Sequence, residues 1–320
     1  MEIGFVGLGK MGLNMVTRLR HHQHRVVVYD RVPEAVAAAT QQGCIGTHSL
    51  AELVGQLTAP RTVWVMVPSG APTEETIHAV AELLQPGDTI IDGGNTNFHD
   101  DTRRAGLLTP KGIHYMDVGT SGGVWGLANG YCLMVGGYEA DVVRLAPVFT
   151  SLAPPDGWAH VGAVGAGHYV KMVHNGIEYS MMQGYAEGFE LMAKSNYQLD
   201  LARIADLWMH GSVVRSWLLE LAAGALKEDP RLDGIKGYVQ DSGEGRWMLQ
   251  DAIDKDVPVP TLATALFTRF RSRQDASFAE RLLAGLRNAF GGHGVRRADL
   301  PAGAGPASSL PDHPPSAKSA

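Results

Sequence analysis

Short apolar runs alternate with longer helical patterns over the first half of the chain. Six runs are expected to form strands, namely EIGFVG, RVVVYD, TVWVMV, DTIIDGG, IHYMDV and YCLMVGG. Each of the first five leads into a turn of Gly, Pro or polar residues. Strands that alternate with helices in this way predict a doubly wound, parallel α/β sheet that is covered on both faces.

The pattern changes near residue 165, where long helical periodicities begin and β-branched runs cease. We therefore expect an α/β domain over residues 1–164 and a shortened all-α domain over residues 165–295. Residues 296–320 are rich in Pro, Gly, Ala and Ser, a composition that predicts a disordered tail.

Composition excludes several classes of function. The chain has 320 residues, 45% of them hydrophobic, and its 27 basic residues are outnumbered by 33 acidic ones, so we expect no nucleic-acid partner. No apolar run reaches the roughly 18 residues of a membrane span, and the N-terminus does not resemble a signal peptide. We expect a cytoplasmic protein without membrane contact. The two cysteines show no metal-ligand spacing, and we predict no metal site.

A glycine-rich turn follows the first expected strand. In GFVGLGKMGLNM, the residues Gly7, Gly9 and Gly12 form G-x-G-x-x-G between a strand and a helix. The first glycine permits the tight turn, the second lets the backbone approach a pyrophosphate, and the third allows close packing of helix on strand. The free N–H groups of the helix then face the phosphates. This arrangement predicts a Rossmann-type domain that binds a dinucleotide.

The end of the second strand bears on the choice of cofactor. Asp30 lies eighteen residues after Gly12, where an acid accepts hydrogen bonds from a ribose diol and repels a 2′-phosphate. The neighbouring Arg31 would instead suit a 2′-phosphate. We predict NAD, with NADP as the less favoured cofactor. The predicted cofactor contacts are Gly7, Leu8, Gly9, Lys10, Met11, Gly12, Asp30, Arg31, Met66, Val67 and Asn95.

Polar turns follow the fourth and fifth expected strands. Asn95 lies in DGGNTNF, and Ser121, Gly122 and Gly123 lie in DVGTSGG. The carboxyl ends of parallel strands meet at one edge of a sheet, so these residues should face the cofactor. An amide, a hydroxyl and unhindered backbone N–H groups are suited to binding a carboxylate.

The stretch KMVHNGIEY, residues 171–179, carries charged and amide side chains within a helical pattern. On a 3.6-residue period a polar stripe forms from Lys171, His174, Asn175, Glu178 and Tyr179, and an apolar set falls opposite, namely Val170, Val173, Ile177 and Met181. A solvated face of an ordinary amphipathic helix would give the same pattern. The stripe by itself leaves both interpretations open.

Taken together, the motifs resemble one enzyme family. GLGKMGLNM, DGGNT, TSGG, KMVHNGIEY and LRNAFGGH occur in the order seen in 6-phosphogluconate dehydrogenase, the decarboxylating enzyme of the pentose phosphate pathway. The resemblance spans roughly residues 1–295. DGGNT and KMVHNGIEY are specific to this family, whereas the glycine fingerprint and the Ser-Gly-Gly turn are shared with other β-hydroxyacid dehydrogenases. The chain resembles a short type that lacks the second half of the helical domain.

The resemblance implies NAD-dependent oxidative decarboxylation of 6-phospho-D-gluconate to ribulose 5-phosphate and CO2. It makes Lys171 the general base and Glu178 the general acid. The positions that would hold the carboxylate and hydroxyls are Asn95, Ser121, Gly122, Gly123, His174 and Asn175. Tyr179, Arg269 and Arg287 match phosphate contacts, and His293 matches a further substrate contact. In long members the equivalents of Arg287 and His293 come from a partner subunit, and we expect a homodimer or homotetramer.

The expected chemistry explains why a base and an acid share one stripe. A lysine whose pKa is lowered by burial would take the hydroxyl proton, and the resulting ammonium would polarise the new ketone. Glu178, with a pKa raised by desolvation, would then protonate the carbanion that forms when CO2 leaves. The ammonium supplies the electron sink that a β-keto acid needs, so no metal is required.

One motif departs from the family pattern. Long members carry Lys-Gly-Thr-Gly-Lys-Trp, with the first lysine on the phosphate, where this chain has SGEGRW. Ser242 therefore replaces a charge, and Arg246 is the candidate to compensate.

Two other functions are weighed against this one. A β-hydroxyacid dehydrogenase for a small unphosphorylated 3-hydroxy acid shares the glycines, the Ser-Gly-Gly turn and Lys171. It does not predict the Asn95 motif, Glu178 after His174 and Asn175, or the arginines at 269 and 287. A nucleotide-sensing protein without turnover requires no acid-base pair. Fold alone does not separate these alternatives.

Overall fold

The computed structural model describes residues 1–292 and 294–296. His293 and residues 297–320 of the predicted tail lie outside the described residues. Within them, no helix combines the length and the apolar character needed to cross a lipid bilayer.

An eight-stranded sheet forms the first part of the molecule, with the strand order β3-β2-β1-β4-β5-β6-β7-β8. The strands are β1 Glu2–Val6, β2 Arg25–Tyr29, β3 Ile45–Gly46, β4 Thr62–Val65, β5 Thr89–Asp92, β6 His114–Ser121, β7 Cys132–Gly136 and β8 Trp158–Gly162. All six expected strands are present, and the doubly wound arrangement is confirmed. The expectation of a wholly parallel sheet is wrong at one edge, because β7 pairs antiparallel with β6. The strands β3 and β8 were not predicted.

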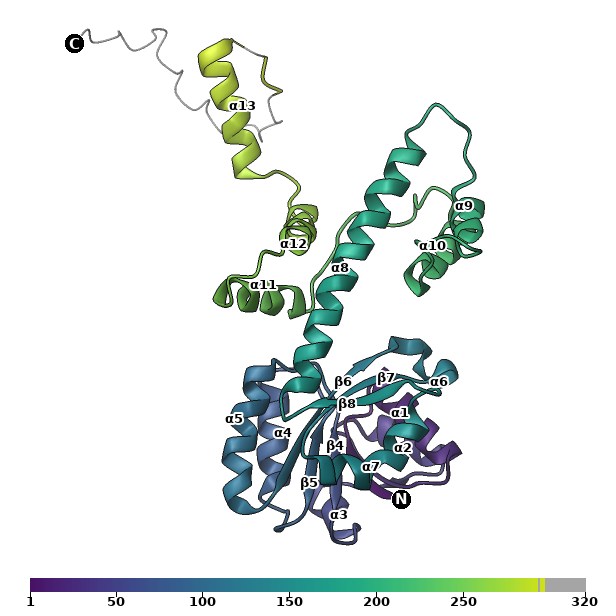
Figure 1. Cartoon of the computed structure of the whole chain (residues 1–320), viewed down its shortest axis with the longest axis vertical. Coiled ribbons are helices and arrows are strands. Elements are labelled where there is room, and N and C mark those ends of the chain that lie inside the picture. The colour runs from purple at the N-terminus through teal and green to yellow at the C-terminus, as the bar shows by residue number, and fades with distance from the viewer. Residues whose placement is uncertain (293, 297–320) are drawn as a thin grey trace, which may run out of the picture.

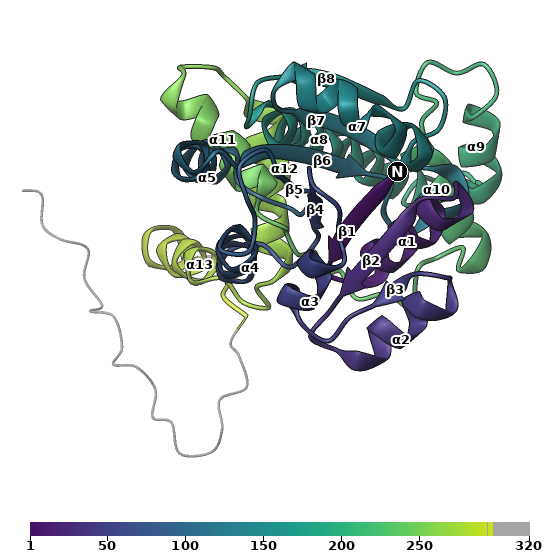
Figure 2. The ribbon, with the colours of Figure 1, turned by 90° about the horizontal axis from the view of Figure 1, so that it is seen from below.

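Helices cover both faces of this sheet (Figures 1 and 2). Apolar residues of α1, α2 and α7 form one core with the sheet, and those of α3, α4 and α5 form a second core on the opposite face. The helices of this part are α1 Lys10–His21, α2 Pro33–Gln41, α3 Leu50–Gly55, α4 Ala71–Ala81, α5 Phe98–Leu108, α6 Gly126–Asn129 and α7 Glu139–Leu152, with short 3-10 turns η1 Thr109–Lys111 and η2 Gly123–Trp125.

A single 28-residue helix, α8 (Ala166–Ala193), rises from the sheet and carries the rest of the chain (Figure 1). The helices α11 (Glu244–Asp254) and α12 (Pro260–Ser272) pack on one side of it, and α9 (Leu201–Trp208) with α10 (Trp217–Glu228) forms a separate small core on the other side. The last helix, α13 (Phe278–Gly291), stands apart from the sheet, and none of its residues is buried.

Candidate active site

A cleft of about 570 Å³ opens at the carboxyl ends of β1 and β2. The lining includes most of the predicted cofactor contacts, namely Gly7, Gly9, Lys10, Met11, Gly12, Asp30, Arg31, Met66, Val67 and Asn95. Leu8 is the exception, because its side chain is buried in the sheet core. Leu8 lies between the buried Gly7 and the exposed Gly9, and its apolar side chain points into the core of the sheet.

The three fingerprint glycines have distinct surroundings. A Cβ on Gly7 would lie 2.3 Å from the carbonyl oxygen of Met66, and a Cβ on Gly12 would lie 2.1 Å from that of Gly7. Both contacts are far too short, so the turn and the helix packing require glycine there. Gly9, in contrast, has open space at its Cβ position. The turn therefore leaves room for a pyrophosphate at the start of α1, as a dinucleotide site needs.

Asp30 is held by the backbone of the cleft. Its Oδ2 accepts a hydrogen bond of 2.6 Å from the N–H of Leu8, and its Oδ1 accepts one of 2.8 Å from the N–H of Val32. The carboxylate is thereby fixed at the end of β2, with its remaining lone pairs available to a ribose diol. Arg31 is exposed beside it and forms no ion pair with any residue that the structure describes.

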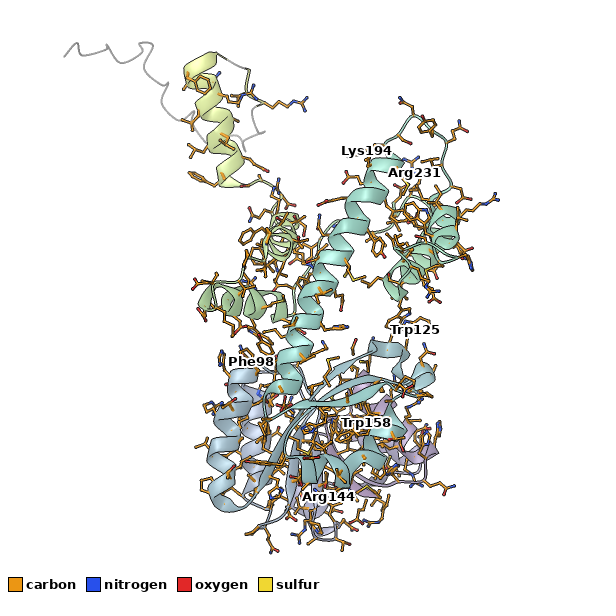
Figure 3. The ribbon with its side chains drawn as sticks, in the orientation of Figure 1. Phe98, Trp125, Arg144, Trp158, Lys194 and Arg231 are labelled. Carbon is orange, nitrogen blue, oxygen red and sulfur yellow. The ribbon has the colours of Figure 1, made fainter. Side chains whose placement is uncertain are left out.

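A second cleft, of about 790 Å³, lies between the end of the sheet and the helices α8 and α10. Most of the predicted substrate and catalytic residues line it, namely Ser121, Gly122, Gly123, Lys171, His174, Asn175 and Glu178. Met11 lines both clefts, so the two adjoin. Trp125 lies on the side of the sheet that faces α10, where it forms part of the wall of the second cleft (Figure 3).

Lys171 reaches this cleft because α8 packs directly on β6. A Cβ on Gly119 of β6 would lie 2.5 Å from the Cβ of Lys171 and 2.6 Å from the carbonyl oxygen of Gly167. Asp117, also on β6, accepts hydrogen bonds from the N–H groups of Gly165 (2.6 Å) and His168 (2.8 Å). An acid at the N-terminus of a helix accepts hydrogen bonds from the free N–H groups of the first turn and interacts favourably with the helix dipole. The sheet therefore fixes the start of α8.

A buried polar network ties the same helix to the turn after β5. His168 Nδ1 lies 2.7 Å from Asp101 Oδ2, and its Nε2 lies 3.1 Å from the carbonyl oxygen of Gly94. Burial alone would lower the pKa of His168, but the Asp101 carboxylate outweighs it and the pKa rises to about 9. Burial raises the pKa of Asp101 to about 6, against the opposing pull of His168. The pair is best described as imidazolium and carboxylate.

Asp92, Asp101 and His168 also present ligand atoms within 4.8 Å of one another. Asp92 already accepts a 3.0 Å hydrogen bond from Arg104, and the other two bind each other. The adjacent guanidinium disfavours a cation here, and the cluster is better explained as a structural support for the turn that holds Asn95.

Lys171 belongs to a continuous polar chain that crosses the two parts of the molecule. Its Nζ donates to Asn175 Oδ1 at 2.7 Å, and Asn175 Nδ2 donates to Glu244 Oε1 at 2.7 Å. Ser242 Oγ donates to Glu244 Oε2 at 2.5 Å. Asn95 Nδ2 donates to the carbonyl oxygen of Ser242 at 3.2 Å. The turn after β5, the helix α8 and the start of α11 are thus joined around the predicted substrate position.

The electrostatics of Lys171 fit the role expected of a base. Burial lowers the pKa of Lys171 below its ordinary value, and the carboxylates of Glu244 and Glu178 oppose that shift. A lysine whose charge is disfavoured by burial loses its proton more readily. The expectation that burial acts on Lys171 in this direction is confirmed.

Two of the three residues matched to phosphate contacts, Tyr179 and Arg269, lie around the loop before α11. The guanidinium of Arg269 lies 3.5 Å from the centre of the Tyr179 ring and donates to the carbonyl oxygen of Gln240 at 2.9 Å. The N–H of Ser242 donates to the Tyr179 hydroxyl at 3.1 Å. This places a cation, a phenol and a serine together, next to the chain of polar residues that leads to Lys171.

Two further arginines lie next to this loop, Arg246 in α11 and Arg273 at the end of α12. Arg246 and Arg273 both pair with Asp241, at 2.7 Å and 3.1 Å. Arg246, the candidate to replace the missing lysine charge, is therefore partly neutralised by its own neighbour. Three guanidinium groups, those of Arg246, Arg273 and Arg269, thus outnumber the two carboxylates around the loop, Asp241 and Glu244, which leaves a net positive charge there.

Arg287 does not join this cluster. It lies on α13, exposed and away from Tyr179 and Ser242. His293, its expected companion, lies outside the residues that the structure describes.

The apolar side of α8 differs from the prediction. Val170, Ile177 and Met181 are 37%, 53% and 39% exposed and line the same cleft as the polar stripe. The helix is instead buried along Gly176 and Tyr179, where α11 approaches it closely. The apolar set is therefore not the buried side of the helix, because it lines the cleft together with Lys171 and Glu178. Asn175 and Tyr179 of the polar stripe are buried instead, on the side where α11 packs.

Sequence reasoning missed the buried ionisable residues that support this site, among them Asp101, Asp117, His168 and Glu244. Two of them had a signal in the sequence. Asp117 interrupts an apolar strand, and an acid inside such a run requires a buried partner. Glu244 lies within SGEGRW, where a glycine on each side allows close approach to another helix.

Comparison with known proteins agrees with this geometry. Residues 2–170 match the family model described as the NAD binding domain of 6-phosphogluconate dehydrogenase, and residues 167–280 match that of the C-terminal domain of the same enzyme. The NAD(+)-dependent, decarboxylating 6-phosphogluconate dehydrogenase of Haloferax volcanii is 44% identical over 301 residues, which cover 93% of this chain and 100% of the relative.

Solved structures show the same architecture. The 6-phosphogluconate dehydrogenase of Plasmodium falciparum is 29% identical with a TM-score of 0.79, over 91% of this chain and 65% of that one. The 3-hydroxyisobutyrate dehydrogenase of Mycobacterium tuberculosis shares the fold, with a TM-score of 0.70 at 24% identity, over 86% of this chain and 94% of that one. From the two family models and the Haloferax relative, the chain belongs to the 6-phosphogluconate dehydrogenase family.

Proposed function

We propose that this protein oxidises and decarboxylates 6-phospho-D-gluconate to ribulose 5-phosphate and CO2, with NAD as the cofactor, as a step of the pentose phosphate pathway. The observation that carries the proposal is that Lys171 and Glu178 line one cleft, directly beside the cleft with the dinucleotide fingerprint. A base and an acid at that junction are what an oxidation followed by a protonation requires.

The residues of the first cleft suit NAD. The open space at Gly9 and the start of α1 would receive the pyrophosphate, and the fixed carboxylate of Asp30 would accept from the ribose hydroxyls. When bound, NAD would supply a hydride acceptor. The carboxylate of Asp30 disfavours a 2′-phosphate, and the exposed Arg31 is the residue that would offset this in NADP.

Two residues of the chain would carry the proton transfers. Neutral Lys171 takes the proton of the 3-hydroxyl, and as ammonium it then polarises the C3 ketone. Departure of CO2 leaves the electron pair of the broken bond in an enediol, and Glu178 protonates its carbon. Ser121 and the glycines after it would hold the substrate carboxylate with a hydroxyl and backbone N–H groups.

The phosphate would lie against the loop before α11. Arg269, Tyr179 and the N–H of Ser242 converge there, and the net positive charge of the three arginines suits an anion. This observation favours a phosphorylated acid over a small unphosphorylated one. The alternative, a β-hydroxyacid dehydrogenase, is favoured by the loss of the lysine charge at Ser242 and by the apolar wall around Trp125 and Trp217.

We also infer that the active enzyme is a homodimer or homotetramer. The second cleft exposes apolar side chains, and so does the helix α13. The exposed apolar residues of α13 are Phe278, Leu282, Leu283, Leu286 and Phe290. Soluble chains rarely leave such surfaces uncovered. A partner subunit that buries α13 would also bring Arg287 towards a phosphate. Light scattering on the purified protein tests this, and a monomer at working concentration contradicts it.

The central test is the formation of reduced nicotinamide at 340 nm with 6-phosphogluconate, run with NAD and with NADP, and with gluconate and 3-hydroxyisobutyrate as controls. We expect turnover of 6-phosphogluconate, faster with NAD, and release of one CO2 per reduced cofactor. Turnover of 3-hydroxyisobutyrate alone would replace this proposal by the alternative. Cofactor binding without turnover of any of these acids would favour a sensor.

A further inference from the structure

The buried carboxylate of Glu244 is unexplained by the acid-base pair described above. Glu244 is the first residue of α11, yet its side chain points inward and is only 4% exposed. Its Oε1 lies 2.7 Å from Asn175 Nδ2 and 3.7 Å from Lys171 Nζ, and its Oε2 lies 2.5 Å from Ser242 Oγ. A charge buried this deeply is costly unless it is paired.

The packing of α11 on α8 fixes where this carboxylate lies. A Cβ on Gly176 of α8 would lie 2.1 Å from the sulfur of Met248, and a Cβ on Gly245 of α11 would lie 2.7 Å from the Tyr179 ring. Glycine on each helix therefore permits a close approach. Glu244, which precedes Gly245, is held against Asn175 by backbone packing as well as by its hydrogen bonds.

Asn175 connects the two charges. Its Oδ1 accepts from Lys171 Nζ at 2.7 Å and lies 3.0 Å from His174 Nδ1, while its Nδ2 donates to Glu244. An amide has one accepting and one donating end, so the carboxylate on one side and the ammonium on the other determine how it is turned. If Glu244 lost its charge, the orientation of Asn175 and the position of Lys171 would both be less strongly defined.

Few other ionisable groups face Lys171. On its own helix these are the carboxylate of Glu178 and, through the shared Asn175 oxygen, the imidazole of His174. From α11 there is only Glu244, and β6 contributes the backbone at Gly119. Among the described residues, Lys171 is the only cation in salt-bridge range of Glu244, and Arg246, two residues further along α11, pairs with Asp241 instead.

We propose that Glu244 is a positioning residue that fixes the Lys171 amine through Asn175 and whose negative charge determines how readily that amine gives up its proton. Burial favours the neutral amine of Lys171, whereas the carboxylate of Glu244 favours the ammonium form. The two effects together set the pH at which the enzyme acquires its base. The kinetic test of this inference rests on the proposed function, whereas the chemical labelling of Lys171 does not.

The first experiment is the pH dependence of kcat/KM for 6-phosphogluconate in wild type and Glu244→Gln. Glutamine can keep both hydrogen bonds without the charge. An opposite charge at this distance shifts a pKa by about one unit or more, so the acid limb should move down by about one pH unit. At a pH below the wild-type transition, kcat/KM of the variant, as a fraction of its own value at the plateau, should then be about tenfold higher than the same fraction for wild type. Glu244→Asp, which retains the charge, should keep the wild-type limb with a lower plateau.

The second experiment does not require turnover. Competitive labelling with trace acetic anhydride, read by mass spectrometry of the Lys171 peptide across a pH series, reports the protonation of Lys171 itself. Glu244→Gln should shift its titration down by about one pH unit. The matched control is Asp251→Asn, which removes another buried acid of α11 that contacts α8, through the Tyr169 hydroxyl at 3.1 Å, but does not face Lys171. This control should leave the Lys171 titration in place.

An unchanged Lys171 titration in folded Glu244→Gln, or an equal shift in Asp251→Asn, would overturn the inference. Circular dichroism and NADH binding establish that each variant is folded. If wild type fails to turn over 6-phosphogluconate, the proposed function fails, and the labelling series still decides the role of Glu244.

Discussion

Replacing Gly119 with alanine should push α8, which carries Lys171, away from the sheet. The added Cβ would lie 2.5 Å from the Cβ of Lys171 and 2.6 Å from the carbonyl oxygen of Gly167. Non-bonded carbon atoms are most favourable at about 3.5–4.0 Å, so α8 must withdraw by about 1 Å. Since one of the clashing atoms belongs to the backbone, no change of rotamer relieves the contact.

The withdrawal affects both stability and rate. Inserting a methyl group into a packed interior of this kind costs about 1–3 kcal/mol. Lys171 moves with the helix while the cofactor cleft stays with the sheet, and a misplacement of about 1 Å between reacting groups costs about 100-fold in rate. We therefore expect kcat to fall by about two orders of magnitude, with a smaller loss of stability.

The assay compares kcat at saturating substrate with the free energy of unfolding in urea. Gly106→Ala is the matched control, because Gly106 lies in α5 with open space at its Cβ position. That variant should keep the wild-type kcat and gain up to about 1 kcal/mol from the higher helix propensity of alanine. A Gly119→Ala enzyme with kcat within twofold of wild type would refute the argument from packing.

Four further predictions follow from the site. Lys171→Ala should abolish hydride transfer while NADH fluorescence still reports binding, and near-normal activity would remove Lys171 from the mechanism. Asp30→Ala should narrow the ratio of kcat/KM between NAD and NADP, and an unchanged ratio would count against the ribose contact. Arg269→Ala should raise KM for 6-phosphogluconate by about tenfold or more, the weight of a hydrogen bond to a charged group, with KM for NAD as the internal control. The free energy of unfolding should fall as pH rises from about 6.5 to about 9, because folded His168 keeps its proton up to a pKa of about 9 whereas the unfolded imidazole releases it near 6.5. Denaturation curves across that pH range test this, and the same fall in His168→Gln would exclude this residue as its cause.

Local patterns in the sequence identify the elements that carry the chemistry. The strands β1, β2, β4, β5, β6 and β7 were all expected, because buried strands are continuous apolar runs that turn residues interrupt. The glycine fingerprint predicts a turn whose steric requirements are met within a few residues. The shared cleft of Lys171 and Glu178 follows from helical periodicity, which is also a local property.

The direction of β7 and the presence of β8 could not be found in this way. An apolar strand gives the same pattern whether its neighbour runs parallel or antiparallel. The central residues of β8 are exposed, so it lacks the apolar run by which the other strands were identified. The apolar side of α8 was misjudged for a related reason, since a periodic pattern does not tell which side another helix will cover.

Short-range sterics and helical periodicity are readable in the sequence, and they predict a dinucleotide cleft at the carboxyl ends of the strands and place Lys171 and Glu178 on one side of a helix. The charges that surround Lys171 became visible only in the folded chain. Glu244 lies 69 residues from Asn175, and Asp101 lies 67 from His168. These buried charges are stabilised by partners from distant parts of the chain, and a local sequence pattern does not predict such a contact.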